Sequence, residues 1–321
     1  MGRTTTRRTW RYVRTAVMTR VAAIDVGTNS TNLLVIDEHG KELTRVITST
    51  RLGEGLHSTG ELSVEAMTRT VEVITSYVAT AQSLGATMIQ IVGTAACRRA
   101  RNTATFSDLL KEKTQLTLEV LSESDEAAMT FSGALIGLPV IDTPTMVIDI
   151  GGGSTEYTVG TEAIEIFASI PFGAVTSTES HISSDLPRPE DLTNLIGAVS
   201  DELEDITRDH PIVATAMRTV GVAGTIVTIA AVELGLHEFD DSALHGMSLS
   251  RDAAEDVFRT VATEPLALRV QNPGLGPDRA DIIVAGCCIL VATMRRLHLS
   301  EITVSTRGLL DGVAHRVRLN S

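Results

Sequence analysis

Two stretches of the chain share one pattern of apolar and polar positions. Each begins with an apolar run that contains an acid, continues through a turn of small and hydroxyl residues, and becomes apolar again. Residues 24–35 read IDVGTNSTNLLV and residues 148–159 read IDIGGGSTEYTV, with identical residues at six of the twelve aligned positions. Strand-forming residues on both sides of a short glycine turn predict a β-hairpin in each stretch.

The two hairpins indicate an internal repeat, because the equivalent acids Asp25 and Asp149 lie 124 residues apart, the size of a small domain. Glycine lets backbone amides approach an anion closely, and successive amides in such a turn form an anion-binding concavity. The sequence lacks a P-loop motif, and a following strand argues against a Rossmann fingerprint. We therefore predict a duplicated α/β domain with facing turns that bind phosphate and acids that bind its divalent metal. The predicted phosphate-binding residues are Gly27, Thr28, Asn29 and Ser30 in the first turn, and Gly151, Gly152, Gly153 and Ser154 in the second.

The rest of the chain alternates between helical and strand patterns, which is typical of an α/β fold. Helices are predicted over residues 62–84, 105–113, 122–138, 189–208, 225–234, 251–263 and 279–297 and from 307 onward, and strands over 87–92, 116–121, 163–170, 219–222 and 301–304. Ser63 and Ser250 are suitable N-caps for two of these helices, and Ser122 or Ser124 for a third. Residues 93–101, which include three arginines, are predicted to form a loop.

Composition narrows the class of protein. With 321 residues, 43% hydrophobic content and a mean hydropathy of +0.15, the chain is long enough for two globular domains. The net charge of −13 disfavours non-specific nucleic-acid binding, so anion binding has to be local. No apolar run reaches the length of a membrane span. Three cysteines without metal-ligand spacing favour a reducing cytoplasm.

The ordered motifs resemble the exopolyphosphatase and guanosine pentaphosphate phosphatase family, within the ASKHA superfamily of acetate kinase, sugar kinases, Hsp70 and actin. Besides the hairpins, five stretches carry the resemblance: GTAACR at 93–98, SDEA at 124–127, SIPFGA at 169–174, GVAGT at 221–225 and RGLLDG at 307–312. The resemblance implies two ribonuclease-H-like α/β domains, each with a mixed five-stranded sheet, and an active site in the cleft between them.

The implied domain organisation assigns residues 18–125 and 306–321 to domain I and residues 126–305 to domain II. Residues 1–17 are rich in Arg and Thr and lack the apolar segment of a secretory signal. We predict that they form a disordered or non-native extension before a natural start at Met18. A basic tail that binds polyphosphate is the alternative.

The resemblance also implies roles for individual residues. Glu126 corresponds to the catalytic glutamate of the family, although acids are common in the first turn of a helix for electrostatic reasons alone. The family has the pattern G-x-E-E-A-R in this region, and residues 124–128 of this chain read SDEAA. Glu126 aligns with the second acid of the pattern, and Ala128 replaces its arginine. One ion pair of the motif is therefore in doubt. Arg98 corresponds to an arginine that contacts phosphoryl oxygens, whereas Arg99 and Arg101 are expected at the rim.

Oxygen ligands without a His or Cys cluster favour a hard cation, Mg²⁺ or Mn²⁺. The expected metal ligands are Asp149 and Glu156, with Asp25 assisting. Three further residues, Arg279, Gly224 and Thr225, are expected along the substrate channel, although helix–sheet packing alone also explains the last two.

The implied function is Mg²⁺-dependent hydrolysis of the terminal phosphate of inorganic polyphosphate. Short chains are favoured, because the net charge repels a long polyanion and the chain shows no His-Asp dyad of the additional domain found in longer family members. Guanosine pentaphosphate 5′-phosphohydrolase is the alternative. An ASKHA kinase and a non-catalytic binder of polyphosphate or guanosine tetraphosphate are disfavoured, since no sugar pocket is recognisable and Glu126, Asp149 and Glu156 are all present. A homodimer is left open.

Overall fold

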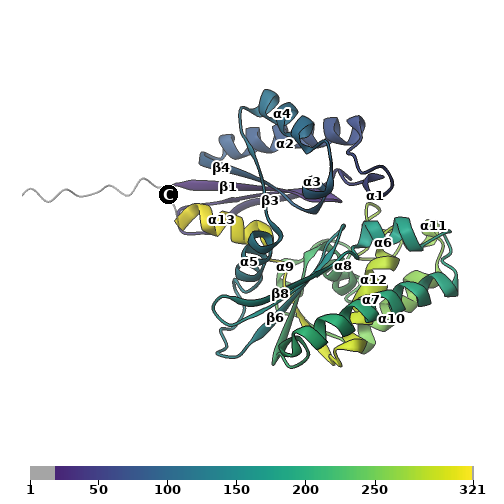
Figure 1. The fold of residues 1–321 in the computed structure, drawn as a ribbon. Coiled ribbons are helices and arrows are strands. Elements are labelled where there is room, and N and C mark those ends of the chain that lie inside the picture. Colours follow the sequence, from purple (N-terminus) through teal and green to yellow (C-terminus); the bar gives the residue numbers. More distant parts are fainter. Residues whose placement is uncertain (1–18, 320–321) are drawn as a thin grey trace, which may run out of the picture.

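The computed structural model describes residues 19–319, so the predicted extension over residues 1–17 lies outside the described residues. The chain forms two α/β units, one above the other in Figure 1, each built around a mixed β-sheet. We call the unit with strands β1–β5 the first unit and the unit with strands β6–β11 the second. Across residues 19–319, no helix combines the length and apolar character needed to cross a membrane.

The first sheet has the strand order β3-β2-β1-β4-β5 and the second β10-β11-β9-β6-β7-β8. The elements up to the second sheet are β1 (Arg20–Val26), β2 (Ser30–Ile36), β3 (Glu42–Ser49), α1 (Leu56–Thr59), α2 (Val64–Ser83), β4 (Ala86–Gly93), α3 (Ala95–Arg99), α4 (Thr103–Thr114), β5 (Leu118–Val120) and α5 (Glu123–Ala134). They are followed by β6 (Thr145–Ile150), β7 (Thr155–Gly160), β8 (Ile164–Ile170), α6 (Ala174–His181), α7 (Pro189–Asp209), the 3₁₀ helix η1 (Pro211–Ala214), β9 (Arg218–Val222), α8 (Ala223–Glu233), α9 (Asp241–Leu244), β10 (Ser248–Ser250), α10 (Arg251–Thr263), α11 (Leu266–Arg269), α12 (Ile283–Arg296), β11 (Glu301–Val304) and α13 (Leu309–Leu319).

The internal repeat is visible in the strand pairing. In the first hairpin β1 pairs antiparallel with β2, and Asp25 lies opposite Asn32. In the second, β6 pairs antiparallel with β7, and Asp149 lies opposite Glu156. Each hairpin has a third antiparallel strand on one side and a parallel strand on the other. The second sheet has six strands rather than the predicted five, because the three-residue strand β10 pairs with β11 and is too short to show a sequence period.

Most predicted elements are present, with three differences. The predicted loop over residues 93–101 contains the short helix α3. Helix α12 begins at Ile283, so Arg279 lies in the preceding loop instead of at a helix start. Strand β3, helix α6 and the four-residue helices α1, η1, α9 and α11 had no prediction. The predicted domain boundary at 125/126 falls inside α5, and this division stays a prediction.

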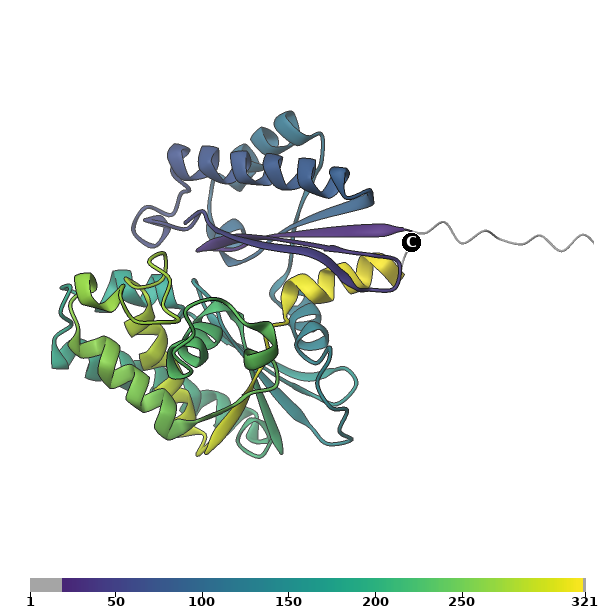
Figure 2. The ribbon, with the colours of Figure 1, turned by 180° about the vertical axis from the view of Figure 1, so that it is seen from behind.

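Both faces of the first sheet are covered, because alternate residues of a strand point to opposite sides. Ala22, Ile24 and Val26 of β1 belong to the core formed with α2 and α4. Val21 and Ala23 belong to the core formed with α13. The final helix therefore returns to the first sheet, as predicted, and lies against it in Figures 1 and 2.

Helices α5 and α13 cross at backbone contact. A Cβ added to Gly133 of α5 would lie 1.9 Å from the carbonyl oxygen of Gly308, and one on Gly312 of α13 would lie 2.0 Å from that of Met129. Helix α5 packs on the second sheet through Phe131, whereas α13 packs on the first. This α5–α13 junction therefore joins the two units rigidly.

We expect Gly312→Ala to destabilise the protein by about 2–3 kcal/mol, because the new methyl group overpacks the α5–α13 junction. The control is Gly197→Ala on α7, where an added Cβ meets nothing within 4 Å. That change should stabilise the protein by about 0.5–1 kcal/mol, the helix preference of Ala over Gly. Urea unfolding followed by circular dichroism measures both, and equal shifts in the same direction would contradict the close crossing.

Candidate active site

A cavity of about 220 Å³ lies where the two units meet. Both hairpin turns, the first turn of α5 and the start of α8 contribute to its wall. Of the site residues predicted from the sequence, all except Arg98 line it: Asp25, Gly27, Thr28, Asn29, Ser30, Glu126, Asp149, Gly151, Gly152, Gly153, Ser154, Glu156, Gly224, Thr225 and Arg279. The fold thus brings together side chains from both copies of the repeat.

The two turns have the same closure and lie in contact. The Gly27 amide donates to the Ser30 carbonyl oxygen at 2.9 Å, and the Gly151 amide donates to that of Ser154 at 3.0 Å. A Cβ on Gly152 would lie 3.1 Å from Cβ of Thr28. The first turn therefore leaves little room for a side chain at position 152. An anion in the cavity would meet backbone amides from both units.

Asp25 and Asp149 lie near the ends of β1 and β6. Burial raises the pKa of Asp25 to about 7, opposed by the hydrogen bond from Asn32 Nδ2 to Asp25 Oδ2 at 3.0 Å and reinforced by the charge of Glu126. Burial, followed by the charges of Glu156 and Glu126, raises the pKa of Asp149 well above its usual range. Both carboxyl groups therefore resist ionisation when no cation is nearby.

Glu156 adds a third acid from β7. Burial and then the charge of Glu126 raise its pKa to about 7, although Ser169 Oγ donates a hydrogen bond to Glu156 Oε1 at 3.1 Å. The cavity wall thus holds several carboxyl groups that are short of compensating positive charge. Such an environment favours a bound cation.

Glu126 is placed by the start of α5. Ser122 is the N-cap and accepts from the Asp125 amide at 3.1 Å, which confirms one of the two predicted caps. Burial raises the pKa of Glu126, and the charge of Arg98 opposes that rise. Asp125 is exposed, and its Oδ2 accepts from Ser122 Oγ at 2.7 Å. Successive helical residues point about 100° apart, so only Glu126 lines the cavity.

Arg98 contacts the candidate base instead of lining the cavity. Its Nη1 donates to Glu126 Oε2 and to the Leu121 carbonyl oxygen, the latter at 3.2 Å. In this arrangement Arg98 orients the Glu126 carboxylate. A contact between Arg98 and a phosphoryl oxygen stays a prediction.

Arg99 is exposed and does not line the cavity, so its place at the rim stays a prediction. Its Nη1 donates to the Gly153 carbonyl oxygen at 2.7 Å, so it joins the first unit to the second turn. Arg101 is exposed and donates to the Thr59 carbonyl oxygen at 2.8 Å, as a rim residue would.

Arg279 projects over the start of α8. A Cβ on Gly224 would lie 2.1 Å from its Nη2, so glycine makes room for the guanidinium. Burial lowers the pKa of Arg279, with Asp278 opposing. Within residues 19–319, no hydrogen bond or ion pair engages this guanidinium, although it lines the cavity. Its charge is therefore available to an anion in the cavity.

The donor set fits a hard divalent cation. Asp25 Oδ1 and Asn32 Oδ1 are buried without a hydrogen-bond partner, and both residues line the cavity. In the described part of the chain, no group of three or more His, Cys, Asp or Glu side chains has the geometry of a metal site. Mg²⁺ commonly uses one or two carboxylates plus water and substrate oxygens, so it does not require such a group. The three-acid ligand set stays a prediction.

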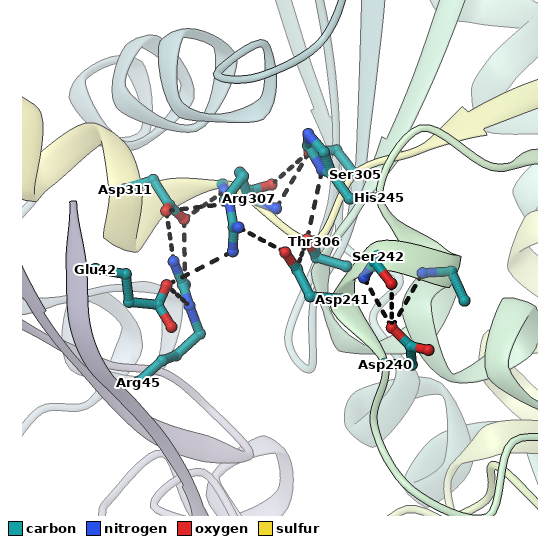
Figure 3. Close-up of polar contacts among 12 residues, drawn as sticks. Glu42, Arg45, Asp240, Asp241, Ser242, His245, Ser305, Thr306, Arg307 and Asp311 are labelled. Carbon is teal, nitrogen blue, oxygen red and sulfur yellow. Dashed lines mark hydrogen bonds and ion pairs between the residues drawn. The ribbon is translucent and has the colours of Figure 1, made fainter. Parts of the chain in front are cut away.

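A polar network at one end of the cavity, shown in Figure 3, was not predicted from the sequence. Arg45 Nη2 of β3 donates to Asp311 Oδ1 of α13 at 2.5 Å, and Arg307 Nη2 donates to Asp241 Oδ2 of α9 at 2.7 Å. Arg45, Arg307 and Asp311 also line the cavity. Arg307 and Asp311 belong to the motif at residues 307–312, but the sequence predicted no role for them. Arg45 had no local signal, since its partner is 266 residues away.

The fold and these motifs have counterparts in known proteins. Residues 34–320 match the model of the Ppx/GppA phosphatase family. Exopolyphosphatase 2 of Mycobacterium tuberculosis is 32% identical over 92% of this chain and 98% of its own length. A guanosine-5'-triphosphate,3'-diphosphate pyrophosphatase of Aeromonas salmonicida is 27% identical over 92% of this chain, which spans 58% of that protein's length. The crystal structure of a Ppx/GppA protein of Aquifex aeolicus matches with a TM-score of 0.78 and 27% identity, over 94% of this chain and 98% of that one.

The raised pKa values predict how the metal-free protein responds to pH. The folded state holds protons on Asp25 and Glu156 up to about pH 7, whereas unfolded carboxyl groups lose them near pH 4. Stability should therefore fall as pH rises from about 4 to 7, by at most about 1.4 kcal/mol per pH unit for each shifted group. Asp25→Asn should flatten this dependence and stabilise the metal-free protein at pH 8, as urea unfolding in EDTA measures. The control is Asp201→Asn on exposed α7, and a wild-type slope in Asp25→Asn would refute the assignment.

Proposed function

The chain belongs to the Ppx/GppA phosphatase family, and we propose that it is an exopolyphosphatase that removes the terminal phosphate of inorganic polyphosphate. The observation that carries this proposal is the single cavity that combines two glycine-rich turns, a buried carboxylate on α5 and an unpaired arginine. The similarity to Exopolyphosphatase 2 over nearly its whole length supports the same reaction.

The two turns cradle the terminal phosphoryl groups. The Gly27 and Gly151 amides close the two turns, and the backbone amides that follow them, Thr28 to Ser30 and Gly152 to Ser154, donate to phosphoryl oxygens, as preorganised donors do in phosphoryl transfer. The binding is local, which reconciles a polyanionic substrate with a net charge of −13. Arg279, beside Gly224 and Thr225, holds the following part of the chain, because its fork can bind two oxygens at once.

Glu126 acts as the general base. It takes a proton from a water molecule whose oxygen forms the new bond to the terminal phosphorus, while the bridging P–O bond breaks and its electrons remain on the shortened chain. Burial raises the pKa of Glu126, and the negative charge of bound substrate raises it further, which makes the carboxylate a better proton acceptor. Arg98 orients the carboxylate through its hydrogen bond.

Asp149 and Glu156 bind Mg²⁺, or Mn²⁺, with Asp25 assisting. When bound, the ion supplies positive charge that neutralises the phosphoryl oxygens. The carboxyl groups and the unpartnered oxygens of Asp25 and Asn32 support a hard cation. Members of this family are generally dependent on a divalent metal, and the choice of Mg²⁺ follows from the oxygen-only donor set.

Guanosine pentaphosphate is the second candidate substrate. Phe239 lines the cavity and is 60% exposed, which offers a surface on which a purine can stack. The similarity to the Aeromonas salmonicida protein supports this alternative.

The cysteines and the net charge bear on where the protein is located and on what it binds. The three cysteines, Cys97, Cys287 and Cys288, are free and buried, which supports a cytoplasmic location. The net charge argues against nucleic acid as a partner. A homodimer stays a prediction.

The deciding experiment compares phosphate release from polyphosphates of several lengths and from guanosine pentaphosphate. We expect turnover of polyphosphate with Mg²⁺, no turnover in EDTA, and a higher kcat/KM for short chains because the net charge repels long ones. Full activity in EDTA would show that the reaction does not require a divalent metal. Turnover of guanosine pentaphosphate alone would establish the second candidate.

A paired substitution tests the base. We expect Glu126→Gln to lower kcat by about 100-fold or more, with polyphosphate and Mg²⁺ still bound, because the amide cannot accept the proton. Asp125→Asn is the matched control, since that side chain is exposed and accepts its hydrogen bond from the helix cap Ser122. Steady-state kinetics and equilibrium binding measure both variants. An inactive Asp125→Asn enzyme with an active Glu126→Gln enzyme would mean that the wrong acid has been assigned.

A further inference from the structure

The two units touch on opposite sides of the cavity by different kinds of contact. On one side is the α5–α13 junction, where apolar cores and bare backbone meet. On the other, α1 of the first unit faces α6 of the second, on the right in Figure 1 and on the left in Figure 2. Within residues 19–319, no hydrophobic core cluster includes residues of both α1 and α6. This second side is held by polar contacts.

The main polar contact is made by Arg51, just after β3. Its Nη1 lies 2.7 Å from Asp281 Oδ2, and its Nη2 lies 3.2 Å from Asp281 Oδ1 and 3.1 Å from the Asp278 carbonyl oxygen. Nearby, the Gly55 amide donates to Glu179 Oε1 of α6 at 3.1 Å. The Arg51 guanidinium therefore makes a bidentate contact with the Asp281 carboxylate. We call this Arg51–Asp281 pair the clasp.

The clasp is connected to the phosphate-binding residues from both units. The Arg51 amide donates to the Asn29 carbonyl oxygen of the first turn at 2.8 Å. Asp281 is two positions from Arg279, which lines the main cavity. A second cavity of about 200 Å³ is lined by Arg51 and Asp281, and it shares Asn29 with the main cavity. The clasp therefore lies beside the turns of the main cavity.

The backbone of Arg51 is also unusual. Its φ is 48°, in the left-handed region that residues other than glycine rarely adopt. Surrounding structure has to hold such a conformation, and functional sites commonly contain it. Here it aims the side chain across the gap between the units.

We propose that the clasp closes the cleft over bound polyphosphate and so sets how many phosphates are removed before the chain dissociates. This inference rests on the proposed function for its substrate. A polymer has to enter a cleft that is open and remain in one that is closed. The α5–α13 junction acts as the pivot, since it is packed too closely to separate, and the clasp is the contact that breaks and re-forms.

The strength of the clasp suits reversible closure. Both of its side chains are 34% exposed. Ion pairs that reach solvent contribute little net stability, because water and salt compete for the charges. Arg51 and Asp281 therefore act as positioning residues: they hold the units together around substrate without touching the reacting atoms.

The first test measures closure without catalysis. Spin labels at Ser58→Cys on α1 and Ser184→Cys after α6 report the distance between the units, since the three natural cysteines are buried. We expect Arg51→Ala to lengthen and broaden this distance, and the charge exchange Arg51→Asp with Asp281→Arg to restore it. The control is Arg316→Ala, which removes a comparably exposed pair with Glu119 inside the first unit. An unchanged distance in Arg51→Ala would overturn the proposal.

The second test measures retention of substrate. In the Glu126→Gln background, Arg51→Ala should speed the dissociation of long-chain polyphosphate about fivefold, with the charge exchange restoring it. In the active enzyme, the same change should lower the number of phosphates released per binding event and raise KM, with kcat nearly unchanged. Wild-type retention in Arg51→Ala would overturn the clasp. Absence of turnover in the wild type would instead refute the proposed function, and the label distances would still decide whether the clasp closes the cleft.

Discussion

The burial of several carboxyl groups in one cavity is the constraint on which the rest of this structure depends. Asp25, Asp149 and Glu156 come from the two hairpins and Glu126 from the helix between them. Water is largely excluded and the charges repel one another, so the pKa values rise. Such a cluster is costly in a folded protein unless a cation and a substrate use it. The sheets and the α5–α13 junction hold these groups in place despite that cost.

The repeat explains both the symmetry of the site and its asymmetry. Each copy contributes a closed turn and an aspartate near the end of a strand. The position opposite the aspartate differs: Asn32 in the first copy donates a hydrogen bond to Asp25, whereas Glu156 in the second adds a negative charge. The second copy therefore carries more uncompensated charge, which favours cation binding on that side of the cavity.

The two sides of the cleft are built for different tasks. At the α5–α13 junction, Gly133 and Gly312 allow backbones to touch, and close packing resists relative movement. At the clasp, the contact between Arg51 and Asp281 is polar and partly exposed, so separating the units there exposes no apolar core. A closely packed contact on one side and a polar contact on the other fit the proposed cleft that opens and closes around bound substrate.

The sequence by itself determined the features that depend on near neighbours. The hairpins are closed by bonds such as that from Gly27 to Ser30, and the helix caps Ser63 and Ser250 accept from amides three residues on, so local pattern predicts them. Only the tertiary structure decided which charged side chains meet. Arg51 finds Asp281 across 230 residues, and Arg98 turns toward Glu126 instead of the cavity. Such pairings depend on how the two units pack against each other, which no local period in the sequence encodes.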